Sequence, residues 1–504
     1  MRPPFDVAVA CEDPRMLKTQ PAPSGRSLYF GGEWHHPSSG RYNPTFNPGL
    51  DEPIGDVAEA GGADVDAAVV AAREAFRVWR DVVPLERGRL LKEVAAVVRA
   101  NARELAALDA ANCGNPVREM IGDAAIAAAQ LDFFAGLVTE MKGDTIPMGP
   151  DALNLTVRQP LGVVARILAF NHPFMFCAGK IAAPLAAGNA VIVKPPEQAP
   201  LSSLRLAELV HGILPKGVFS VLPGGREAGA ALAGHPGIDK VAIIGSVGAG
   251  RAVMRAASDT IKPVLLELGG KNALIAFPDA GPEQVAQAIV AGMNFTWCGQ
   301  SCGSTSRAFV HRAIYEDVLA RLPAKASHYV PGLPTDEATT MGALISRTQY
   351  ERVLGYIASA REEGARLVTG GGTPDGPALK KGFYIEPTIF ADVEPGMRIA
   401  REEIFGPVLA IAPWDDEAAM VSQVNGVEYG LTCSIWTNDL LKAHRTAMAV
   451  EAGFVWINEV SKHFLGAPFG GWKQSGLGRE ECLGELLAFT QEKNVHVSLK
   501  QGRA

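Results

Sequence analysis

The chain has 504 residues, of which 47% are hydrophobic and 20% charged, and its formal net charge is -7. One hydrophobic core rarely supports this length, so we expect two or three domains. The acidic balance and the lack of a basic tract disfavour a nucleic-acid-binding protein, and no uncharged apolar run reaches the roughly 20 residues of a membrane span. The 7 cysteines are odd in number and scattered along the chain, so they do not indicate a set of disulfide bonds. We therefore expect a reducing, cytoplasmic environment.

Residues 1–26 carry acidic side chains early and lack the apolar core of a signal peptide, so we expect a flexible arm. Short runs broken by Gly, Pro and Asn predict strands over residues 27–60. Apolar residues then recur at helical spacing, which predicts amphipathic helices over residues 65–80, 85–108 and 121–141. The first part of the chain therefore indicates helical cover for a sheet.

The pattern changes after residue 150. Residues 153–160 alternate like an exposed strand, and buried strands are predicted at 162–170, 190–194, 218–222 and 240–244. Helices are predicted between them, the first over residues 175–187. Such alternation is typical of βαβ units, hence of a parallel sheet with helices on both faces. Ligands of these sheets bind beyond the carboxyl ends of the strands. Four candidate residues stand at such ends: Asn171, Lys194, Gly245 and Glu267.

A second α/β pattern begins after residue 270, with a strand at 272–277, a helix at 283–293 and a further strand at 308–311. The fold class is therefore α/β, with a Rossmann-type parallel sheet domain followed by a second α/β domain. Residues 468–480 are too glycine-rich for a core element. Residues 495–499 alternate like an edge strand that needs a partner.

The segment 295–304 carries the residue on which the functional hypothesis depends, Cys302. Glycines and small polar residues surround it, whereas a core cysteine would lie among aliphatic residues. A thiol attacks as thiolate, so it needs a base, and Glu267 at the end of an apolar strand is the candidate because burial raises a carboxyl pKa. Cys298 is interpreted as a spare thiol, and we expect no metal site.

Several motifs occur in a fixed order, and together they are more specific than any one alone: Phe170-Asn171, Lys194-Pro-Pro-Glu197, Gly245-Ser246 with Gly250, Glu267-Leu-Gly-Gly, Gly299-Gln-Ser-Cys302, Glu403-Ile-Phe-Gly-Pro and Pro468-Phe-Gly-Gly. In these motifs, from about residue 28 to the C-terminus, the chain resembles the NAD(P)-dependent aldehyde dehydrogenase superfamily of the hydrolytic type. The resemblance implies an NAD-binding domain (residues 1–140 and 161–269), a catalytic domain (270–485) and a small β oligomerisation arm (141–160 and 486–504). It also implies a homodimer or homotetramer.

By this resemblance, Cys302 is the nucleophile that adds to an aldehyde carbonyl. The side chain of Asn171 and the Cys302 backbone N–H would bind the oxyanion, and Glu267 would activate the water that hydrolyses the thioester. Lys180 and Glu480 correspond to the proton-relay partners of that glutamate.

The implied cofactor is NAD. Glu197 and Lys194 follow a strand end, where a carboxylate binds both ribose hydroxyls and repels a 2′-phosphate, so NAD is favoured while NADP stays an alternative. Ser246 begins a helix and would contact the pyrophosphate. The remaining expected cofactor residues are Phe170, Gly245, Glu403 and Phe405.

The expected substrate tunnel departs from the usual family pattern, since the oxyanion asparagine lies in Ala169-Phe-Asn-His-Pro. By family position its lining residues are His172, Met175, Phe176, Thr296, Ser301, His463 and Phe469. Imidazoles among aromatic side chains suit a neutral aromatic or hydroxylated aldehyde. The lack of arginine at these positions disfavours a semialdehyde, and Gly179 in place of a bulky aromatic disfavours betaine aldehyde.

Three alternatives stay open. The enzyme could act on a semialdehyde or betaine aldehyde, or it could be a CoA-acylating relative that passes the thioester to coenzyme A. Those relatives typically lack the hydrolytic glutamate, which is present here as Glu267. The third alternative is an inactive NAD-binding scaffold, against which the joint presence of Cys302, Asn171 and Glu267 argues.

Overall fold

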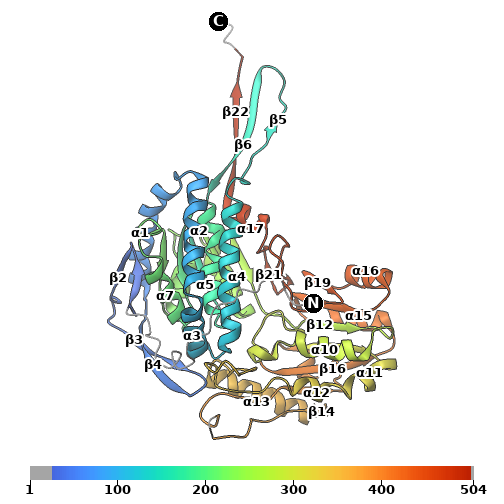
Figure 1. The fold of residues 1–504 in the computed structure, drawn as a ribbon. Coiled ribbons are helices and arrows are strands. Elements are labelled where there is room, and N and C mark those ends of the chain that lie inside the picture. Colours follow the sequence, from blue (N-terminus) through green and yellow to red (C-terminus); the bar gives the residue numbers. More distant parts are fainter. Residues whose placement is uncertain (1–24, 378, 501–504) are drawn as a thin grey trace.

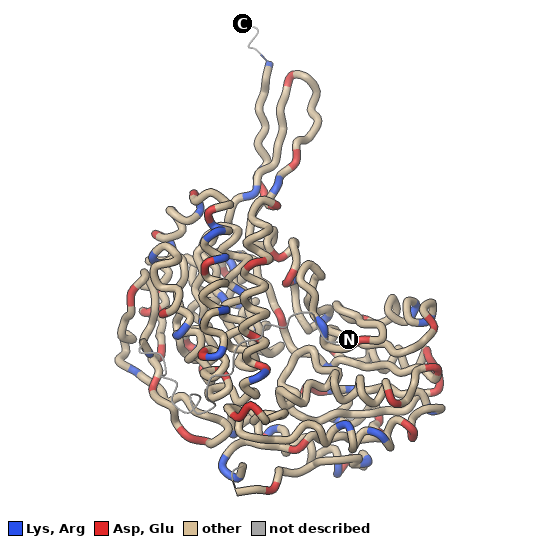
Figure 2. The backbone as a smooth tube through the Cα atoms, in the orientation of Figure 1, with Lys and Arg blue, Asp and Glu red and all other residues tan. Residues whose placement is uncertain are grey.

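The computed structural model describes residues 25–377 and 379–500. Two α/β bodies lie side by side, and a narrow β arm projects from the first (Figure 1). Acidic and basic residues are interspersed along the backbone of both bodies (Figure 2). No helix among the described residues is long and apolar enough to cross a membrane.

The first body is built on an eight-stranded sheet in the order β2-β1-β9-β8-β7-β10-β11-β21. Its central strands run parallel, and antiparallel β1 and β21 pair with β9 and β11. The central strands are buried on both faces, which is why they read as continuous Val, Ile and Ala runs. The strands are β1 (Leu28–Phe30), β2 (Glu33–His35), β7 (Val163–Ile167), β8 (Ala190–Lys194), β9 (Phe219–Val221), β10 (Lys240–Ile244), β11 (Val264–Glu267) and β21 (Gly476–Leu477).

Helices cover both faces of this sheet, and alternate residues of each strand enter opposite cores. Val191 and Val193 of β8 pack with the helices of one face, whereas Ala190 and Ile192 pack with those of the other. The first face carries α2 (Pro84–Ala100), α3 (Ala102–Cys113), α4 (Val117–Gly136), α5 (Pro173–Lys180), α6 (Ala182–Ala186), α7 (Leu201–Leu209) and α17 (Leu483–Ala488). The second carries α1 (Gly62–Trp79), α8 (Arg226–Gly234) and α9 (Val247–Ser258).

The second body contains a seven-stranded sheet in the order β14-β15-β16-β13-β12-β18-β19, antiparallel only at β14. Its strands are β12 (Ala273–Ala276), β13 (Arg307–His311), β14 (Arg366–Thr369), β15 (Thr388–Ala391), β16 (Val408–Trp414), β18 (Thr432–Trp436) and β19 (Phe454–Ile457). Its helices are α10 (Pro282–Gly292), the 3-10 turn η2 (Phe295–Trp297), α11 (Arg312–Leu319), α12 (Leu322–Ala326), α13 (Arg347–Glu362), α14 (Arg398–Arg401), α15 (Glu417–Asn425) and α16 (Leu440–Ala449). The α/β fold class is confirmed.

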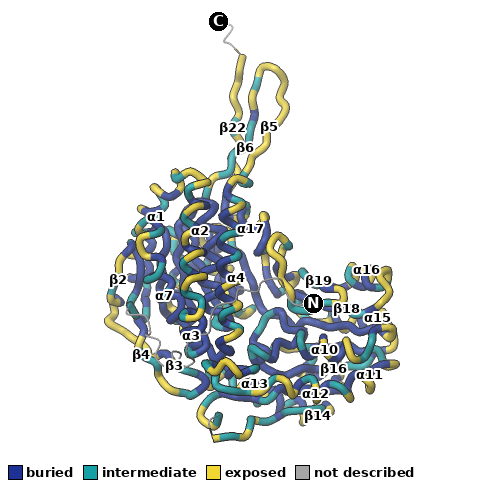
Figure 3. Tube along the Cα trace, viewed as in Figure 1, coloured by how far each residue is buried: buried dark blue, intermediate teal, exposed yellow. Residues whose placement is uncertain are grey.

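The arm is a three-stranded antiparallel sheet in the order β22-β6-β5. It consists of β5 (Thr145–Ile146), β6 (Ala152–Pro160) and β22 (Thr490–Ser498), and much of it is exposed (Figure 3). The edge strand predicted near the C-terminus therefore pairs with β6, from Thr490 opposite Pro160 to Ser498 opposite Ala152. Two small pairs complete the structure: β3 (Tyr42–Asn47) with β4 (Glu52–Ala58), and β17 (Tyr429–Gly430) with β20 (Trp472–Lys473).

Two predicted helices are interrupted in the structure. The helix predicted over residues 85–108 divides at Asn101, whose side-chain amide donates to the Val97 carbonyl and so ends α2. The helix predicted to run to residue 187 divides at Ile181 into α5 and α6. The expected arm at residues 1–26 lies almost wholly outside the described residues. Strand β21 joins the first sheet although it follows the second body in sequence, and the domain boundaries given above stay a proposal.

Candidate active site

The ends of the parallel strands bring the predicted residues to one edge of the first sheet. Glu267 is the last residue of β11 and lies in register with Ile244 of β10. Lys194 ends β8, and Asn171 follows β7 by a short loop. Carboxyl ends of parallel strands share one edge, which explains how residues far apart in sequence meet there.

The loop after Glu267 contacts the Cys302 loop directly. Asn272 donates from Nδ2 to the carbonyl of Cys302 over 2.6 Å and to that of Ser304 over 2.9 Å. A Cβ on Gly270 would lie only 2.7 Å from the Cys302 carbonyl oxygen, so glycine permits this approach. The candidate nucleophile and the candidate base therefore belong to two segments that are held against each other.

Burial controls the charge of both groups. Burial raises the pKa of Glu267 well above its ordinary value, with a further increase from Glu480 and an opposing effect of Lys180. Its carboxylate oxygens make no hydrogen bond within the part of the chain that the structure describes. Burial also raises the pKa of the Cys302 thiol, and the carboxylates of Glu267 and Glu403 raise it further. Burial therefore shifts both groups toward their protonated, neutral forms relative to the same groups in water.

A buried charge network lies behind Glu267. Lys180 Nζ lies 2.9 Å from Oε2 of Glu480 and 3.4 Å from Oε1 of Glu481. Arg166 of β7 pairs with Glu480 and with Glu485, each at 2.8 Å. Although burial opposes it, Lys180 together with His463 holds the pKa of Glu481 at about 2. Glu480 is thus an internal ion-pair partner of Lys180.

Buried polar side chains from the α3–α4 region hold the Asn171 loop. Asn115 donates from Nδ2 to the carbonyl of Asn171 over 2.7 Å. The backbone N–H of Phe174 donates to Oδ2 of Asp109 over 3.0 Å. The backbone that carries the Asn171 side chain is therefore held at both points.

The expected adenosine side of the cofactor site is lined by glycine. A Cβ on Gly225, which precedes α8, would lie 3.0 Å from Oε2 of Glu197, and one on Gly229 would lie 3.7 Å from Cδ of Lys194. Lys194 donates from Nζ to the Pro195 carbonyl over 3.0 Å, and burial lowers its pKa to about 8. The exposed Glu197 carboxylate therefore lies close to the Gly225 backbone, where a side chain would approach it closely.

Ser246 and Gly245 connect β10 to α9. The Ser246 Oγ accepts from the backbone N–H of Ala249 over 3.2 Å, so this serine caps the helix. The helix N-terminus still offers a partial positive charge to an anion.

The two bodies meet at the expected nicotinamide side. Glu403 accepts from the Gly270 N–H over 2.9 Å, and burial raises its pKa. The rings of Phe170 and Phe405 lie edge to face at 5.6 Å. Phe405 has a φ of 54°, and Gln349 donates to its carbonyl over 2.7 Å, which holds this uncommon conformation.

The expected tunnel residues fall into two groups. His172 packs edge to face on Trp297 at 4.9 Å and on Phe176 at 5.6 Å. His463 lies 4.3 Å from the Phe469 ring and bonds Glu481 over 3.1 Å. The other expected residues lie nearby in sequence: Met175, half-buried in α5, Thr296 in η2, and Ser301 beside Cys302.

The model of the aldehyde dehydrogenase family matches residues 34–495. The chain belongs to the aldehyde dehydrogenase family. It is 52% identical over 485 residues to aldehyde dehydrogenase tropH of Talaromyces stipitatus, covering 95% of this chain and 94% of that protein. It is 41% identical to betaine aldehyde dehydrogenase 1 of Rhizobium meliloti, covering 94% and 97%. The structure of the aldehyde dehydrogenase of Bacillus cereus in complex with NAD+ has a TM-score of 0.91 at 38% identity, covering 94% and 96%. The chain is thus an NAD-dependent aldehyde dehydrogenase, as predicted.

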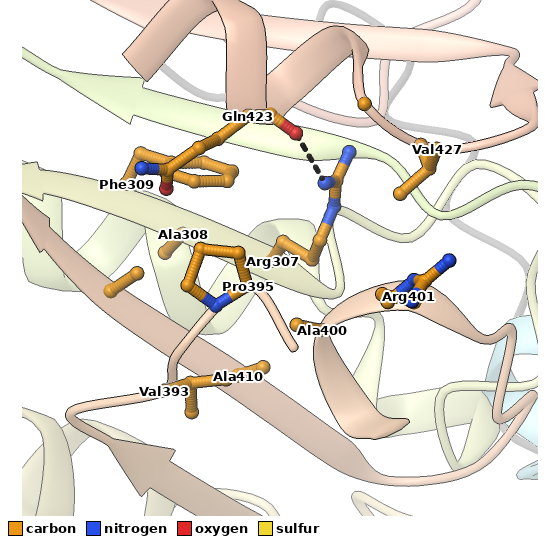
Figure 4. A pocket seen from close by; sticks show the side chains of 12 residues that line it. Arg307, Ala308, Phe309, Val393, Pro395, Ala400, Arg401, Ala410, Gln423 and Val427 are labelled. Carbon is orange, nitrogen blue, oxygen red and sulfur yellow. Dashed lines mark hydrogen bonds between the residues drawn. The ribbon is translucent and has the colours of Figure 1, made fainter. Parts of the chain in front are cut away.

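This aldehyde dehydrogenase also has a cavity of about 90 Å³ in its second body, between β13, β16 and the end of α15 (Figure 4). Arg307 lines it and donates to the carbonyls of Gln423 and Val424 at the C-terminus of α15. The guanidinium thereby donates hydrogen bonds to backbone carbonyls that have no partner within the helix, which is a structural role. Neither Cys302 nor Glu267 lines this cavity.

Several residues that support the site are not among those predicted from the sequence. Asn272 lies in the Glu267 segment and could have been noticed there, and Asn115 lies in a Gly-Asn-Pro turn between two helices. Trp297 and Glu481 adjoin predicted residues, but their contacts with His172 and Lys180 come from distant segments, as does the contact of Gln349 with Phe405.

Proposed function

We propose that this enzyme oxidises its aldehyde through a thiohemiacetal and then a thioester on Cys302, which water activated by Glu267 hydrolyses. The contact of Gly270 and Asn272 with the Cys302 backbone supports this proposal most directly, because it joins nucleophile and base in one site. Glu267 also distinguishes this mechanism from transfer of the acyl group to coenzyme A.

In the first half-reaction, the Cys302 sulfur forms a bond to the aldehyde carbon, and the thiol proton passes to Glu267 or to solvent. The carbonyl oxygen becomes an oxyanion, which the Asn171 side-chain amide and the Cys302 N–H stabilise. NAD, when bound, supplies the acceptor for the hydride that leaves the same carbon. The thioester remains on Cys302.

In the second half-reaction, Glu267 accepts a proton from water as the water oxygen attacks the thioester carbon. The carbon–sulfur bond breaks, the carboxylic acid leaves, and Cys302 regains its proton. Lys180 and Glu480 would pass the proton of Glu267 onward through their 2.9 Å contact.

The residues present fit a dinucleotide. Glu197 and Lys194 would bind the adenosine ribose beside the glycine-lined surface, and Gly245 and Ser246 would contact the pyrophosphate at the start of α9. The nicotinamide end would be held by Glu403, Phe405 and Phe170. Glu197 favours NAD, and NADP use is the alternative.

For the substrate we propose a neutral aromatic or hydroxylated aldehyde, since aromatic and imidazole side chains surround the expected tunnel. A semialdehyde or a betaine aldehyde is the alternative. At Gly179 a Cβ would lie 1.8 Å from Oε1 of Gln130, so Gln130 fills the place of a bulky aromatic there. A cation cage is therefore disfavoured.

We also propose a cytoplasmic location and a homodimer or homotetramer assembled through the β arm.

A turnover assay tests this function. Purified enzyme with NAD should form NADH and free acid from benzaldehydes, with lower kcat/KM on aliphatic aldehydes, semialdehydes and betaine aldehyde. Acyl-CoA as the main product in the presence of coenzyme A would refute hydrolysis. NAD binding without turnover of any aldehyde would favour the inactive scaffold.

A further inference from the structure

Two buried cations lie in contact at the start of the second body, and the proposed chemistry uses neither. Lys271 is 1% exposed and Arg307 is 5% exposed. Arg307 donates from Nε to the Lys271 carbonyl over 2.9 Å. Burial and then the charge of Arg307 lower the pKa of Lys271 to about 7. Buried charges are ordinarily paired, so these two cations require a compensating negative charge.

The hydrogen bonds of the two cations do not supply that charge. Arg307 donates to the backbone carbonyls of Lys271, Gln423 and Val424, which are neutral acceptors (Figure 4 shows the Gln423 bond). Lys271 Nζ makes no hydrogen bond within the part of the chain that the structure describes. A lysine nitrogen is a hydrogen-bond donor in its charged and neutral forms alike, so a buried one needs an acceptor at any pH.

The nearby carboxylates are bonded to other groups. Glu403 and Glu402 both oppose the lowering of the Lys271 pKa. Glu403 accepts from the Gly270 N–H over 2.9 Å. Glu402 accepts from the Tyr356 hydroxyl over 2.7 Å. Neither carboxylate bonds the Lys271 amine, so their charges act on it only from a distance.

A small cavity borders both cations. It is distinct from the cavity of Figure 4, and its volume of about 10 Å³ holds one water molecule or one small ion. The rest of its wall comes from residues 272–273, 424–425, 429–433 and 450–452. Two basic side chains on one wall favour an anion, because hydrogen bonds from a charged donor to an anion are the strong ones. The size of the cavity excludes sulfate and phosphate.

We propose that this cavity binds a halide-sized anion, such as chloride, between the side chains of Lys271 and Arg307. The anion supplies the negative charge that the surrounding carboxylates do not bring to Lys271. It also braces the segment in which Lys271 lies between Gly270 and Asn272, the two residues that contact the Cys302 carbonyl. The inference goes beyond the proposed function, since the anion site uses neither aldehyde nor NAD.

Thermal melting tests for the bound anion. Wild-type enzyme should melt roughly 1 to 3 °C higher in sodium chloride than in sodium isethionate at equal ionic strength, and the gain should level off as the site saturates. Isethionate is too large for the cavity. Lys271→Met, which keeps the length of the side chain without its charge, should abolish the difference. Lys142→Met, at a surface lysine paired with Glu140, is the matched control and should retain it.

The gain from chloride should be larger at pH 6 than at pH 8.5. Lys271 is charged below its pKa of about 7, and a bound anion and this proton stabilise each other. Burial raises the pKa values of Tyr429 and Cys433, which line the cavity, to about 12, so both stay neutral over this range. The carboxyls on this side are Glu402, Glu403 and Glu451. Any titration of these carboxyls persists in Lys271→Met and is thereby subtracted.

Crystals of the wild type grown in sodium bromide locate the anion directly. An anomalous bromine peak should lie within hydrogen-bonding reach of Lys271 Nζ and should be missing in Lys271→Met. A wild-type cavity without a peak would overturn the inference even if the variant fails to fold. A peak without a chloride-specific gain in melting temperature would show an adventitious ion only and would overturn it as well. Both measurements omit aldehyde and NAD, so their failure leaves the proposed function untouched.

Discussion

The side-chain amide of Asn115 donates a hydrogen bond to the backbone carbonyl of Asn171 over 2.7 Å, with both residues buried. Asn115 joins α3 to α4, whereas Asn171 follows β7, so the bond ties the proposed oxyanion donor to the helical layer. The position of the proposed oxyanion donor thus depends on a residue between two helices of the first body.

Asn115→Ala should lower kcat roughly tenfold with little change in the KM for NAD, because misplacement weakens transition-state stabilisation. Asn171→Ala should have a larger effect and raise the activation free energy by about 2.7 to 4 kcal/mol, because it removes the hydrogen-bond donor itself. Steady-state kinetics with benzaldehyde measure both. Asn101→Ala, which removes another amide-to-carbonyl bond at a helix end, is the control. An equal kcat in Asn115→Ala and the wild type would contradict the positioning role.

Glu267→Gln should still form the acyl-enzyme and its first equivalent of NADH but hydrolyse the thioester slowly. The amide cannot accept a proton from water, while the thiol chemistry of Cys302 remains. Cys302→Ala should produce neither the burst nor turnover. Rapid-mixing absorbance of NADH distinguishes these outcomes. Normal steady-state turnover by Glu267→Gln would mean that another group activates the water.

Lys180→Met should move the pH dependence of deacylation to higher pH. Glu267 acts as a base only above its pKa, which burial and Glu480 raise and Lys180 lowers. Removing the lysine charge raises this pKa further, so half-maximal deacylation requires a higher pH. Single-turnover hydrolysis between about pH 6 and pH 10 would show the shift, with Lys142→Met as a surface control and thermal melting as a check of folding. A shift to lower pH would contradict the prediction.

Glu197→Ser should weaken the preference for NAD over NADP by roughly tenfold or more, because a carboxylate repels the 2′-phosphate. The measured quantity is the ratio of kcat/KM for the two cofactors at fixed ionic strength. If the ratio stays constant, Glu197 does not face the adenosine ribose.

Asp109→Asn should stabilise the protein at pH 8 more than at pH 4.5. Burial raises the pKa of Asp109 from its ordinary value to about 7. A raised carboxyl pKa contributes stability at low pH that is lost as pH increases from about 4 to about 7. Asparagine can accept the Phe174 hydrogen bond without ionising. Each pKa unit corresponds to about 1.36 kcal/mol, so the gain could reach a few kcal/mol. Equal melting-temperature changes at both pH values would contradict this.

Sequence pattern predicted the order of elements well wherever local periodicity dominates. The strand at residues 240–244 matches β10, since a buried parallel strand is a continuous apolar run. The helices predicted over 85–108 and 175–187 were each divided, because a side-chain hydrogen bond at Asn101 and the turn at Ile181 interrupt a continuing apolar pattern.

The amino-acid sequence by itself determined the two α/β units, the family, and the identities of the candidate nucleophile, base and oxyanion donor. These depend on residue type and order along the chain. Only the tertiary structure decided which side chains surround them. Asn272 bonds the Cys302 carbonyl, Asn115 bonds the Asn171 carbonyl, and Asp123 bonds the His172 ring. Burial and partners set the charge of a side chain and the position of a loop, and both come from segments far apart in sequence.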